Sequence, residues 1–232
     1  MQADRDPRRR RQLYGRRQGP ALSARQAGLL GERLPQLRVE PGEGKLRHPR
    51  QLFGRHVEEV WLEIGFGGGE HLAWQAAAHP ATGFIGCEAY INGIVKLLSA
   101  VEEQGLDNIR IHDGDAREVV GEFGDGSIGR IFLLFPDPWP KRRHSKRRIV
   151  TSTMLGELHR ILKPGGLLRF ASDSSDYVAW TLIQVRAHAG FAWTAEAPQD
   201  WRERPPDWPE TRYEVKARRN GRKPMFLAFQ RV

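Results

Sequence analysis

The chain has 232 residues, carries a net charge of +9 and has a pI near 10.2. This length suits one domain with appendages, and the positive charge favours an acidic partner. The single cysteine, Cys87, excludes a disulfide framework and a Cys/His metal cluster, so we expect no metal. Without an apolar stretch of roughly 18 residues or a signal peptide, the chain is predicted to be soluble, cytoplasmic and without a membrane partner.

Residues 1–58 are predicted to form a basic arm and linker, and residues 59–232 the main domain. Seven arginines fall within Met1–Arg17, opposed by two aspartates. Such a polar segment buries little, so it either solubilises the chain or folds onto nucleic acid. Ser23 is a good N-cap and predicts a short helix to Arg33, and prolines and glycines from Pro35 to Gly54 then predict a loop.

The chain after residue 59 is typical of a nucleotide-binding half. Val60–Ile64 predicts a strand, and a glycine-rich turn with Gly65 and Gly67 leads from it into a helix, which lets the backbone approach a ligand closely. Glu70 stands where the dinucleotide fingerprint requires a third glycine, and its charge would repel a pyrophosphate. Glu63 interrupts the apolar strand, so it either caps the strand end in water or meets a cationic ligand. The pattern favours a ligand without phosphate.

Acidic residues follow the next two predicted strands. Phe84–Cys87 ends at Glu88, 23 residues after Gly65. An acid there can accept hydrogen bonds from both ribose hydroxyls, and we favour this role over a surface glutamate that begins the next helix. Asp115 follows the strand Asn108–His112. It is expected to cap the next helix, to reach an adenine amino group, or to do both.

Phe135–Arg148 is the most distinctive stretch of the sequence. The apolar run Ile131–Phe135 predicts a buried parallel strand, and Asp137 is held stiffly between two prolines at its C-terminal end. Six of the eight residues in Lys141–Arg148 are Lys or Arg. A charge run alone is usually a solvated face, but beside a rigid carboxylate and Trp139 it indicates binding of nucleic acid.

The C-terminal half continues the alternation of strands and helices. Further strands are predicted at Leu167–Ala171, Phe191–Thr194 and Met225–Arg231, the last of them antiparallel. Asp173 follows the first of these strands, either as a helix cap or as a substrate contact. Asp200–Arg212 contains three prolines and two tryptophans, which predicts an irregular, substrate-facing loop. The whole pattern predicts a doubly wound, mainly parallel α/β sheet.

Two motifs carry a resemblance to a known family. Glu63–Gly69 (EIGFGGG) resembles the first motif of AdoMet-dependent methyltransferases. Pro136–Arg148 (PDPWPKRRHSKRR) is similar, nearly residue for residue, to the signature of bacterial tRNA (guanine-N7)-methyltransferases. The segment from Tyr14 to Gln26 and the T-x-x-E motif Thr211–Glu214 resemble further parts of that family, so the match covers almost the whole chain. The resemblance implies a Rossmann-like class I fold with seven strands. It also implies methyl transfer from S-adenosyl-L-methionine (AdoMet) to guanine N7 of tRNA, in the variable loop.

The resemblance also implies roles for individual residues, and Asp137 is expected to be catalytic. Contacts with the cofactor are implied for Glu63, Gly65, Gly67, Glu88, Asp115 and Asp137. Contacts with the guanine or the RNA are implied for Lys141, Arg143, His144, Ser145, Lys146, Arg147, Arg148, Asp173, Thr211, Arg212, Tyr213 and Glu214. AdoMet carries a sulfonium and an ammonium and no phosphate, so an acidic pocket suits it.

Some positions depart from the family pattern. Lys216 stands where the family often has Arg, and Lys keeps the charge but loses the bidentate fork. Pro20 and Ser23 replace an Arg and a Thr of the basic segment. These differences concern the grip on tRNA rather than the class of reaction.

Two alternatives remain open at this stage. One is a methyltransferase for another RNA or for a small molecule, and the other is a non-catalytic RNA-binding protein with the same fold. The acidic set opposes the second alternative, because RNA binding alone requires no acidic cofactor pocket. The sequence leaves open whether the protein is a monomer or a homodimer.

Overall fold

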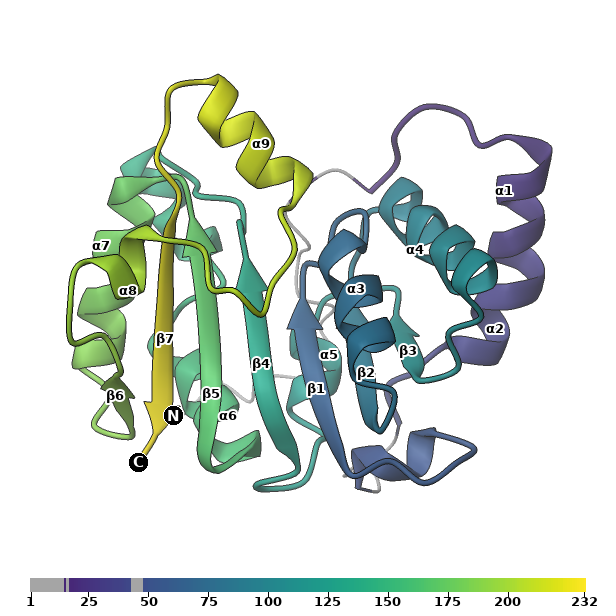
Figure 1. Cartoon of the computed structure of the whole chain (residues 1–232), viewed down its shortest axis with the longest axis horizontal. Helices are drawn as coiled ribbons and strands as arrows, with labels where there is room; N and C mark the ends of the chain where they lie inside the picture. The colour runs from purple at the N-terminus through teal and green to yellow at the C-terminus, as the bar shows by residue number, and fades with distance from the viewer. Residues whose placement is uncertain (1–14, 16, 43–47) are drawn as a thin grey trace, which may run out of the picture.

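A seven-stranded sheet with helices on both faces forms the described part of the chain (Figure 1). The computed structural model describes residues 15, 17–42 and 48–232. The strands are β1 (Glu59–Ile64), β2 (Thr82–Cys87), β3 (Ile109–His112), β4 (Ile128–Leu134), β5 (Leu162–Ser172), β6 (Phe191–Trp193) and β7 (Met225–Arg231). Their order is β3-β2-β1-β4-β5-β7-β6. β7 pairs antiparallel with β5 and β6, and the other neighbours pair in parallel, which confirms the predicted fold class.

The central strands are apolar along their length because both of their faces are covered. In β1, Val60, Leu62 and Ile64 belong to one core cluster, whereas Trp61 belongs to the other. Such a strand shows a nearly continuous apolar run instead of an alternating pattern. The apolar runs of the central strands are therefore what predicts them from the sequence.

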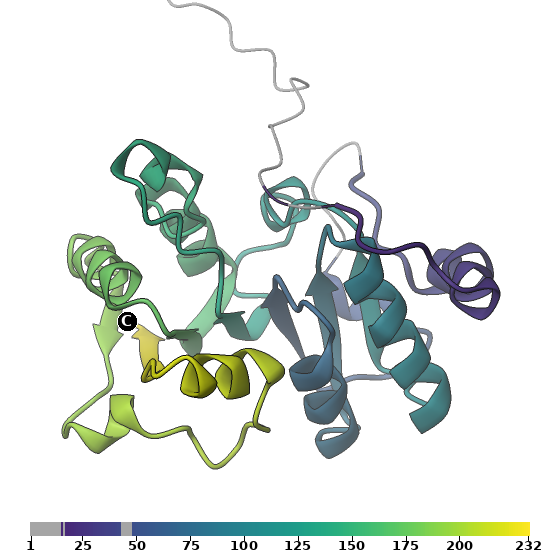
Figure 2. The ribbon, with the colours of Figure 1, turned by 90° about the horizontal axis from the view of Figure 1, so that it is seen from above.

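The helices divide between the two faces of the sheet (Figure 2). The core clusters place α3, α4 and the N-terminal helix on one face and α5, α6 and α7 on the other. Their bounds are α3 (Glu70–Ala78), α4 (Ile91–Gln104), α5 (Arg117–Val120), α6 (Ser152–Ile161), α7 (Ser175–Arg186), α8 (Gln199–Arg202) and α9 (Arg212–Arg219). Two 3₁₀ segments are η2 (Pro49–Leu52) and η3 (Arg142–Arg147).

The N-terminal helix is longer than predicted. It begins after Ser23, which forms a capping box with Gln26, and continues as α1 (Ala24–Gly28), the π-helical η1 (Leu29–Arg33) and α2 (Leu34–Leu37). The predicted loop at Pro35 is therefore wrong. The amide of Leu34 donates to the carbonyl of Leu29, five residues back, so the ladder has already widened where Pro35 removes a donor.

The described part of the arm packs onto the domain. The carbonyl of Arg17 accepts a 2.9 Å hydrogen bond from the amide of Ile91, and the side chain of Asn92 bonds the backbone of Gly19 and Pro20. Nearly all of the basic segment Met1–Arg17 lies outside the described residues, so its predicted folding onto nucleic acid stays a prediction. None of the described helices has the length and apolarity that a membrane span requires.

The segment that precedes β7 contains a helix that was not predicted. Residues 203–211 lack helix and strand, as expected, but Asp200–Arg202 belong to α8, so the predicted start of the loop is wrong. α9 then begins at Arg212, with Thr211 as its N-cap, because the Thr211 hydroxyl accepts from the Glu214 amide at 3.3 Å. A T-x-x-E sequence is also the signature of a capping box, so the helix start was readable from this motif. Figure 1 shows α9 above the carboxyl ends of the parallel strands.

Candidate functional site

A cavity of about 370 Å³ opens at the carboxyl edge of β1, β2 and β4. In doubly wound sheets, ligands bind at this edge, where the strand order reverses. Here the reversal lies between β1 and β4, because β2 and β3 lie on one side of β1 and β4 and β5 on the other. The cavity is lined by Gly15, Ile64, Gly65, Gly67, Cys87, Glu88, Ala89, Tyr90, Gly114, Asp115, Ala116, Arg117, Leu133, Phe135, Pro136, Asp137, Trp139, Arg147, Ile149 and Tyr213.

The glycine-rich turn forms one wall of the cavity. Gly67 has a φ of +58°, a backbone conformation that residues other than glycine rarely adopt. A Cβ atom at this position would lie 2.9 Å from the ring of Tyr213, which comes from α9. The ring of Tyr213 also stacks on Phe135 at 6.3 Å between centroids. Glycine therefore lets an aromatic side chain from the C-terminal half close over the turn.

Glu88 lies in the cavity and is held by the backbone. Its Oε2 accepts from the amide of Gly67 at 2.7 Å, and its Oε1 accepts from the amides of Ala89 and Tyr90 at 2.8 and 2.9 Å. Burial raises the pKa of Glu88, although these three donors favour the carboxylate. A carboxylate has about four acceptor positions, so one remains, on Oε2. This position is available to a ligand, and the expected contact with the ribose hydroxyls stays a prediction.

Asp115 also lines the cavity, and most of its acceptor positions are occupied. Its side chain is 3% exposed. Both of its oxygens accept from Nε of Arg117 at 2.9 Å, and Oδ1 also accepts from the Arg117 amide at 3.0 Å. The N-cap of α5 is Ala116 and not Asp115 as expected, but Asp115, one residue earlier, still accepts from the amide of Arg117, the first residue of the helix. Contact with an adenine stays a prediction.

Glu63 is not among the residues that line the cavity. Its side chain is 3% exposed and accepts a 2.7 Å hydrogen bond from Nδ1 of His71 in α3. The amide of Gln75 in turn lies 3.2 Å from Nε2 of His71 and donates to the carbonyl of Asp207 at 2.7 Å. A buried carboxylate needs such a partner. The structure therefore gives Glu63 a buried protein partner, which excludes the alternative of a strand end capped in water. Its expected contact with the cofactor stays a prediction.

Asp137 differs from the other two carboxylates of the cavity because it has no partner in the described part of the chain. It is exposed at the mouth of the cavity, but the surrounding protein desolvates it enough to raise its pKa. The backbone beside it is strained, since Phe135 and Trp139 have φ values of +50° and +43°. A bond from the Phe135 amide to the carbonyl of Ala171, 2.7 Å long, fixes the start of this turn. Asp137 is thus a rigid and available acceptor.

The basic run separates into exposed and buried cations. It forms η3, with Lys141 as the N-cap residue, and Lys141, Arg143 and Lys146 are exposed. Arg147 lines the cavity, with its guanidinium 4.9 Å from the centre of the Trp139 ring. His144 lies edge-on to the same ring at 6.0 Å; desolvation and the neighbouring cations lower the pKa of His144. Ser145 is half-buried.

Arg148 is a correction to the predicted RNA surface. It is 4% exposed and donates to the carbonyl of Pro138 at 2.9 Å and to the carboxylate of Asp176. Its guanidinium also lies over Tyr177 and Trp180, at 5.0 and 5.1 Å from the ring centres. In this position it holds the Asp137 turn against α7 and does not present a charge to RNA.

The residues expected to grip the guanine lie beside the cavity, and most are engaged with the protein. Asp173 accepts a 2.9 Å bond from Arg222. Glu214 is 1% exposed and accepts from Arg218, and burial raises its pKa despite the nearby cations. Arg212 lies 3.4 Å from the carboxylate of Glu70. Only Tyr213 of this set lines the cavity, so contact of the others with guanine stays a prediction.

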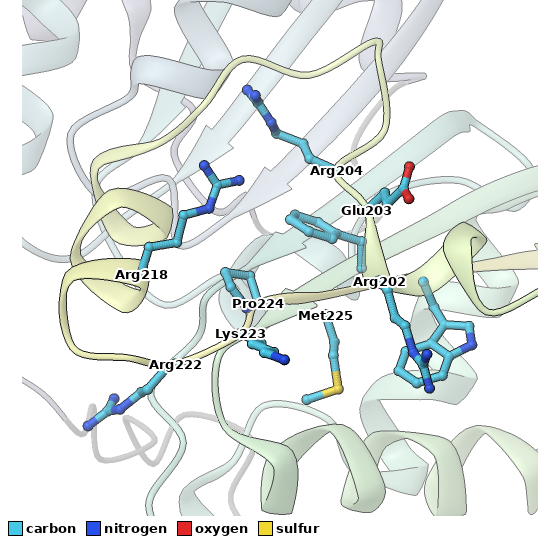
Figure 3. A pocket seen from close by; sticks show the side chains of 10 residues that line it. Arg202, Glu203, Arg204, Arg218, Arg222, Lys223, Pro224 and Met225 are labelled. Carbon is cyan, nitrogen blue, oxygen red and sulfur yellow. The ribbon is translucent and has the colours of Figure 1, made fainter.

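Sequence reasoning missed a second cavity, of about 940 Å³, at the same edge of the sheet (Figure 3). Its lining residues are Trp201, Arg202, Glu203, Arg204, Arg218, Arg222, Lys223, Pro224, Met225 and Phe226. Arg218, Arg222 and Lys223 belong to a basic stretch at residues 216–223, which is a local signal, whereas Arg202 and Arg204 lie apart from it in the sequence. Among the described residues, no group of three or more His, Cys, Asp or Glu side chains is placed to hold a metal ion.

Solved structures with a similar fold cover about three quarters of the chain. The 16S rRNA methyltransferase KamB has a TM-score of 0.53 at 16% identity and covers 76% of this chain and 89% of its own. The aminoglycoside resistance methyltransferase NpmB1 has a TM-score of 0.51 at 19% identity, with 76% and 88% covered. The [4+2]-cyclase SpnF is equally similar, at 0.51 and 14%, with 77% and 76% covered. These likenesses show the class I methyltransferase fold alone, and a cyclase among them shows that the fold does not decide the reaction.

Sequence comparison is more specific. The model of the family called Putative methyltransferase matches residues 57–227. The tRNA (guanine-N(7)-)-methyltransferase of Rhodospirillum rubrum is 53% identical, with 94% of this chain and 87% of the relative covered. Proteins of the same name from Rhizobium meliloti and Agrobacterium fabrum are 50% and 46% identical, with 95% and 100% of both chains covered. With such identity over nearly its whole length, the chain belongs to the family of tRNA (guanine-N7-)-methyltransferases.

Proposed function

We propose that this enzyme transfers the methyl group of AdoMet to N7 of a guanine in tRNA, forming 7-methylguanosine. The names of the relatives supply the reaction. The observation in this chain that carries it is an acidic cavity directly beside a basic surface, joined by the rigid turn around Asp137. An acidic cavity suits a cationic cofactor, and a basic surface suits RNA.

The cavity fits AdoMet in charge and size. Three carboxylates line it, those of Glu88, Asp115 and Asp137, and its volume of about 370 Å³ lies in the range of small-molecule sites. When bound, AdoMet supplies an electrophilic methyl group on a positively charged sulfur. We expect Oε2 of Glu88 to accept from a ribose hydroxyl and Asp115 to meet the adenine. Glu63, which the family resemblance also assigns to the cofactor, is buried against His71.

Asp137 acts by charge and position in this reaction, not as a base. Guanine N7 already presents an unprotonated lone pair in the neutral base, so no proton has to be removed. Positive charge develops on the purine as the methyl group is transferred. A fixed carboxylate without a partner in the described protein stabilises this charge without having to reorganise. Its rigid turn also helps to hold the base in line with the methyl group.

The RNA is held by the exposed cations of η3, mainly through its phosphates. Lys141, Arg143 and Lys146 provide the charges, and Arg147 stands between this surface and the cavity. By resemblance to the family, the target guanine lies in the variable loop. We expect the enzyme to work in the cytoplasm, because tRNA is its substrate.

Nucleoside mass spectrometry tests the proposal. Unmodified tRNA transcripts are incubated with the protein and methyl-labelled AdoMet, digested, and analysed for labelled 7-methylguanosine. The matched control is the Asp137→Ala variant, and ribosomal RNA and free guanosine serve as competing substrates. Label on ribosomal RNA or guanosine at the rate seen with tRNA would contradict the substrate, and label on another atom of the base would contradict the reaction.

A further inference from the structure

The second cavity is lined mainly by positively charged side chains. Five of its ten lining residues are Arg or Lys, and Glu203 alone is acidic. Figure 3 shows Arg218 and Arg222 on one side and Arg202 on the other, with Lys223 and Met225 between them. Such a concentration of positive charge in a hollow favours an anionic ligand.

The structure fixes part of this charge and leaves the rest available. Arg204 and Arg218 both reach the buried carboxylate of Glu214, and Arg222 donates to Asp173. For Arg202 and Lys223, both exposed, no ion pair is formed in the described part of the chain. The first three arginines therefore build the wall, and the last two provide the free charges.

The floor of the cavity is apolar. Met225 and Phe226 begin β7, and Pro224 precedes them. Trp201, which also lines the cavity, is half-buried, with the Arg202 guanidinium 4.6 Å from its ring centre. A phosphate alone would need no such floor. Aromatic and apolar surface beside cations is the arrangement that binds single-stranded nucleotides, with the base on the floor and the phosphate at the rim.

The position of the cavity relates it to the target guanine. Ser172 pairs with Met225, so the end of β5 and the start of β7 meet at the edge where Asp173 lies. Proteins that recognise a base of an RNA loop generally bind it unstacked, so we expect the guanine of the variable loop to be turned out of its stack. The nucleotide next to it then loses a stacking partner as well and needs a new one.

We propose that the cavity bounded by α8, α9 and the start of β7 holds a nucleotide that flanks the target guanine in the tRNA. Its phosphate contacts Arg202 and Lys223, and its base lies on Trp201 and Met225. This inference rests on the proposed function, because it takes tRNA as the substrate. It adds a binding site that lies outside the Pro136–Arg148 and Thr211–Glu214 motifs.

Thermodynamic cycles between protein and RNA test this contact. Two tRNAs each carry one neutral methylphosphonate linkage, immediately 5′ or 3′ of the target guanosine, and their dissociation constants are measured by fluorescence anisotropy at fixed salt. With the wild-type protein, one of the two linkages is expected to weaken binding roughly tenfold. With Lys223→Ala, the same linkage is expected to cause a clearly smaller loss, because one of the two cations that meet the phosphate is already absent.

The control is Arg186→Ala, which removes the same charge from the exposed last residue of α7. In that variant the neutral linkage should still weaken binding by the full factor.

An abasic nucleotide at the same flanking position gives the second cycle, with Trp201→Leu as the partner variant. Losses that simply multiply in either cycle, for both flanking positions, would overturn the proposal.

A phosphate titration distinguishes a flanking nucleotide from a free phosphate compound as the occupant of the cavity. The binding measurement also distinguishes failure of this proposal from failure of the proposed function. Inorganic phosphate, titrated by calorimetry, is expected to bind too weakly to measure, because it lacks the base. Tight binding of phosphate that is lost in Lys223→Ala would mean that the cavity serves a free phosphate compound, and would overturn the proposal. The anisotropy readout requires no methyl transfer. Tight tRNA binding without methylation would therefore contradict the proposed function and leave this inference intact.

Discussion

Two cavities share the carboxyl edge of one sheet and carry opposite charge. The smaller, at β1, β2 and β4, is lined by the carboxylates of Glu88, Asp115 and Asp137, and the larger, at β5 and β7, is lined by five cations. α9 divides them, because Tyr213 lines the first and Arg218 lines the second. A cationic cofactor and an anionic substrate are thereby directed to different places on the same edge.

The two cavities also hold their charges in the same way. In each, most of the charged groups are fixed by the protein: Glu88 by three amides, and Arg204 and Arg218 by Glu214. In each cavity, a few charged side chains have no ion-pair partner among the described residues: Asp137 in the first, and Arg202 and Lys223 in the second. The fixed groups set the shape of a cavity, and the remaining ones are available to a ligand.

The largest effect on the acidic side is expected for Asp137→Ala. Loss of one preorganised electrostatic stabiliser should lower the single-turnover rate by roughly a hundredfold or more. Asp137→Asn keeps the shape but removes the charge, so it should be nearly as slow. Rapid-quench measurements with saturating tRNA and AdoMet give the rates, and thermal unfolding checks that both variants are folded.

The pH dependence of the single-turnover rate distinguishes an electrostatic role of Asp137 from a role as a general base. The raised pKa of Asp137 means that its carboxylate is protonated at a higher pH than an ordinary aspartate. The rate should therefore decline on the acid side, and it should be flat between about pH 6 and 8. A log-linear rise of unit slope across that range, abolished in Asp137→Ala, would show that a base is at work.

Glu88→Ala should weaken cofactor binding by about 2–3 kcal/mol, or roughly 30- to 150-fold. The variant removes a charge-assisted acceptor and frees the three amides that it holds. Calorimetry with AdoMet and with an analogue that lacks one ribose hydroxyl tests the assignment. In the wild type one hydroxyl should matter, and in the variant neither should. Unchanged AdoMet affinity in Glu88→Ala would refute the role.

The smallest effects sharpen the contrast within the basic run. Arg148→Ala should lower the free energy of unfolding by about 2–3 kcal/mol, since it removes buried hydrogen bonds and contacts with two aromatic rings.

Arg143→Ala should leave the free energy of unfolding within about 0.5 kcal/mol and reduce the magnitude of the salt slope of tRNA binding by about 0.7–0.9. Denaturant unfolding and salt-dependent binding measure both. A stable Arg148→Ala protein with the reduced slope would show that Arg148, too, contacts RNA.

Much of this protein is determined by its sequence. The apolar runs predict the strands because both faces of a central strand are buried, and the prolines around Asp137 predict a rigid carboxylate at a strand end. The glycine-rich turn after β1 likewise follows from local sequence, because positive φ angles select glycine there. These features depend on residues that are neighbours in the chain.

The tertiary structure decided which charges are available. Glu63 and Arg148 belong to the most specific motifs of the sequence, but both are buried, one against His71 and the other against Asp176. The cations of the second cavity come from α8, α9 and the segments that follow these two helices, and they meet only in the folded chain. Whether a charged side chain meets a ligand depends on the groups that surround it. Those groups are contributed by segments distant in sequence, which no local pattern identifies.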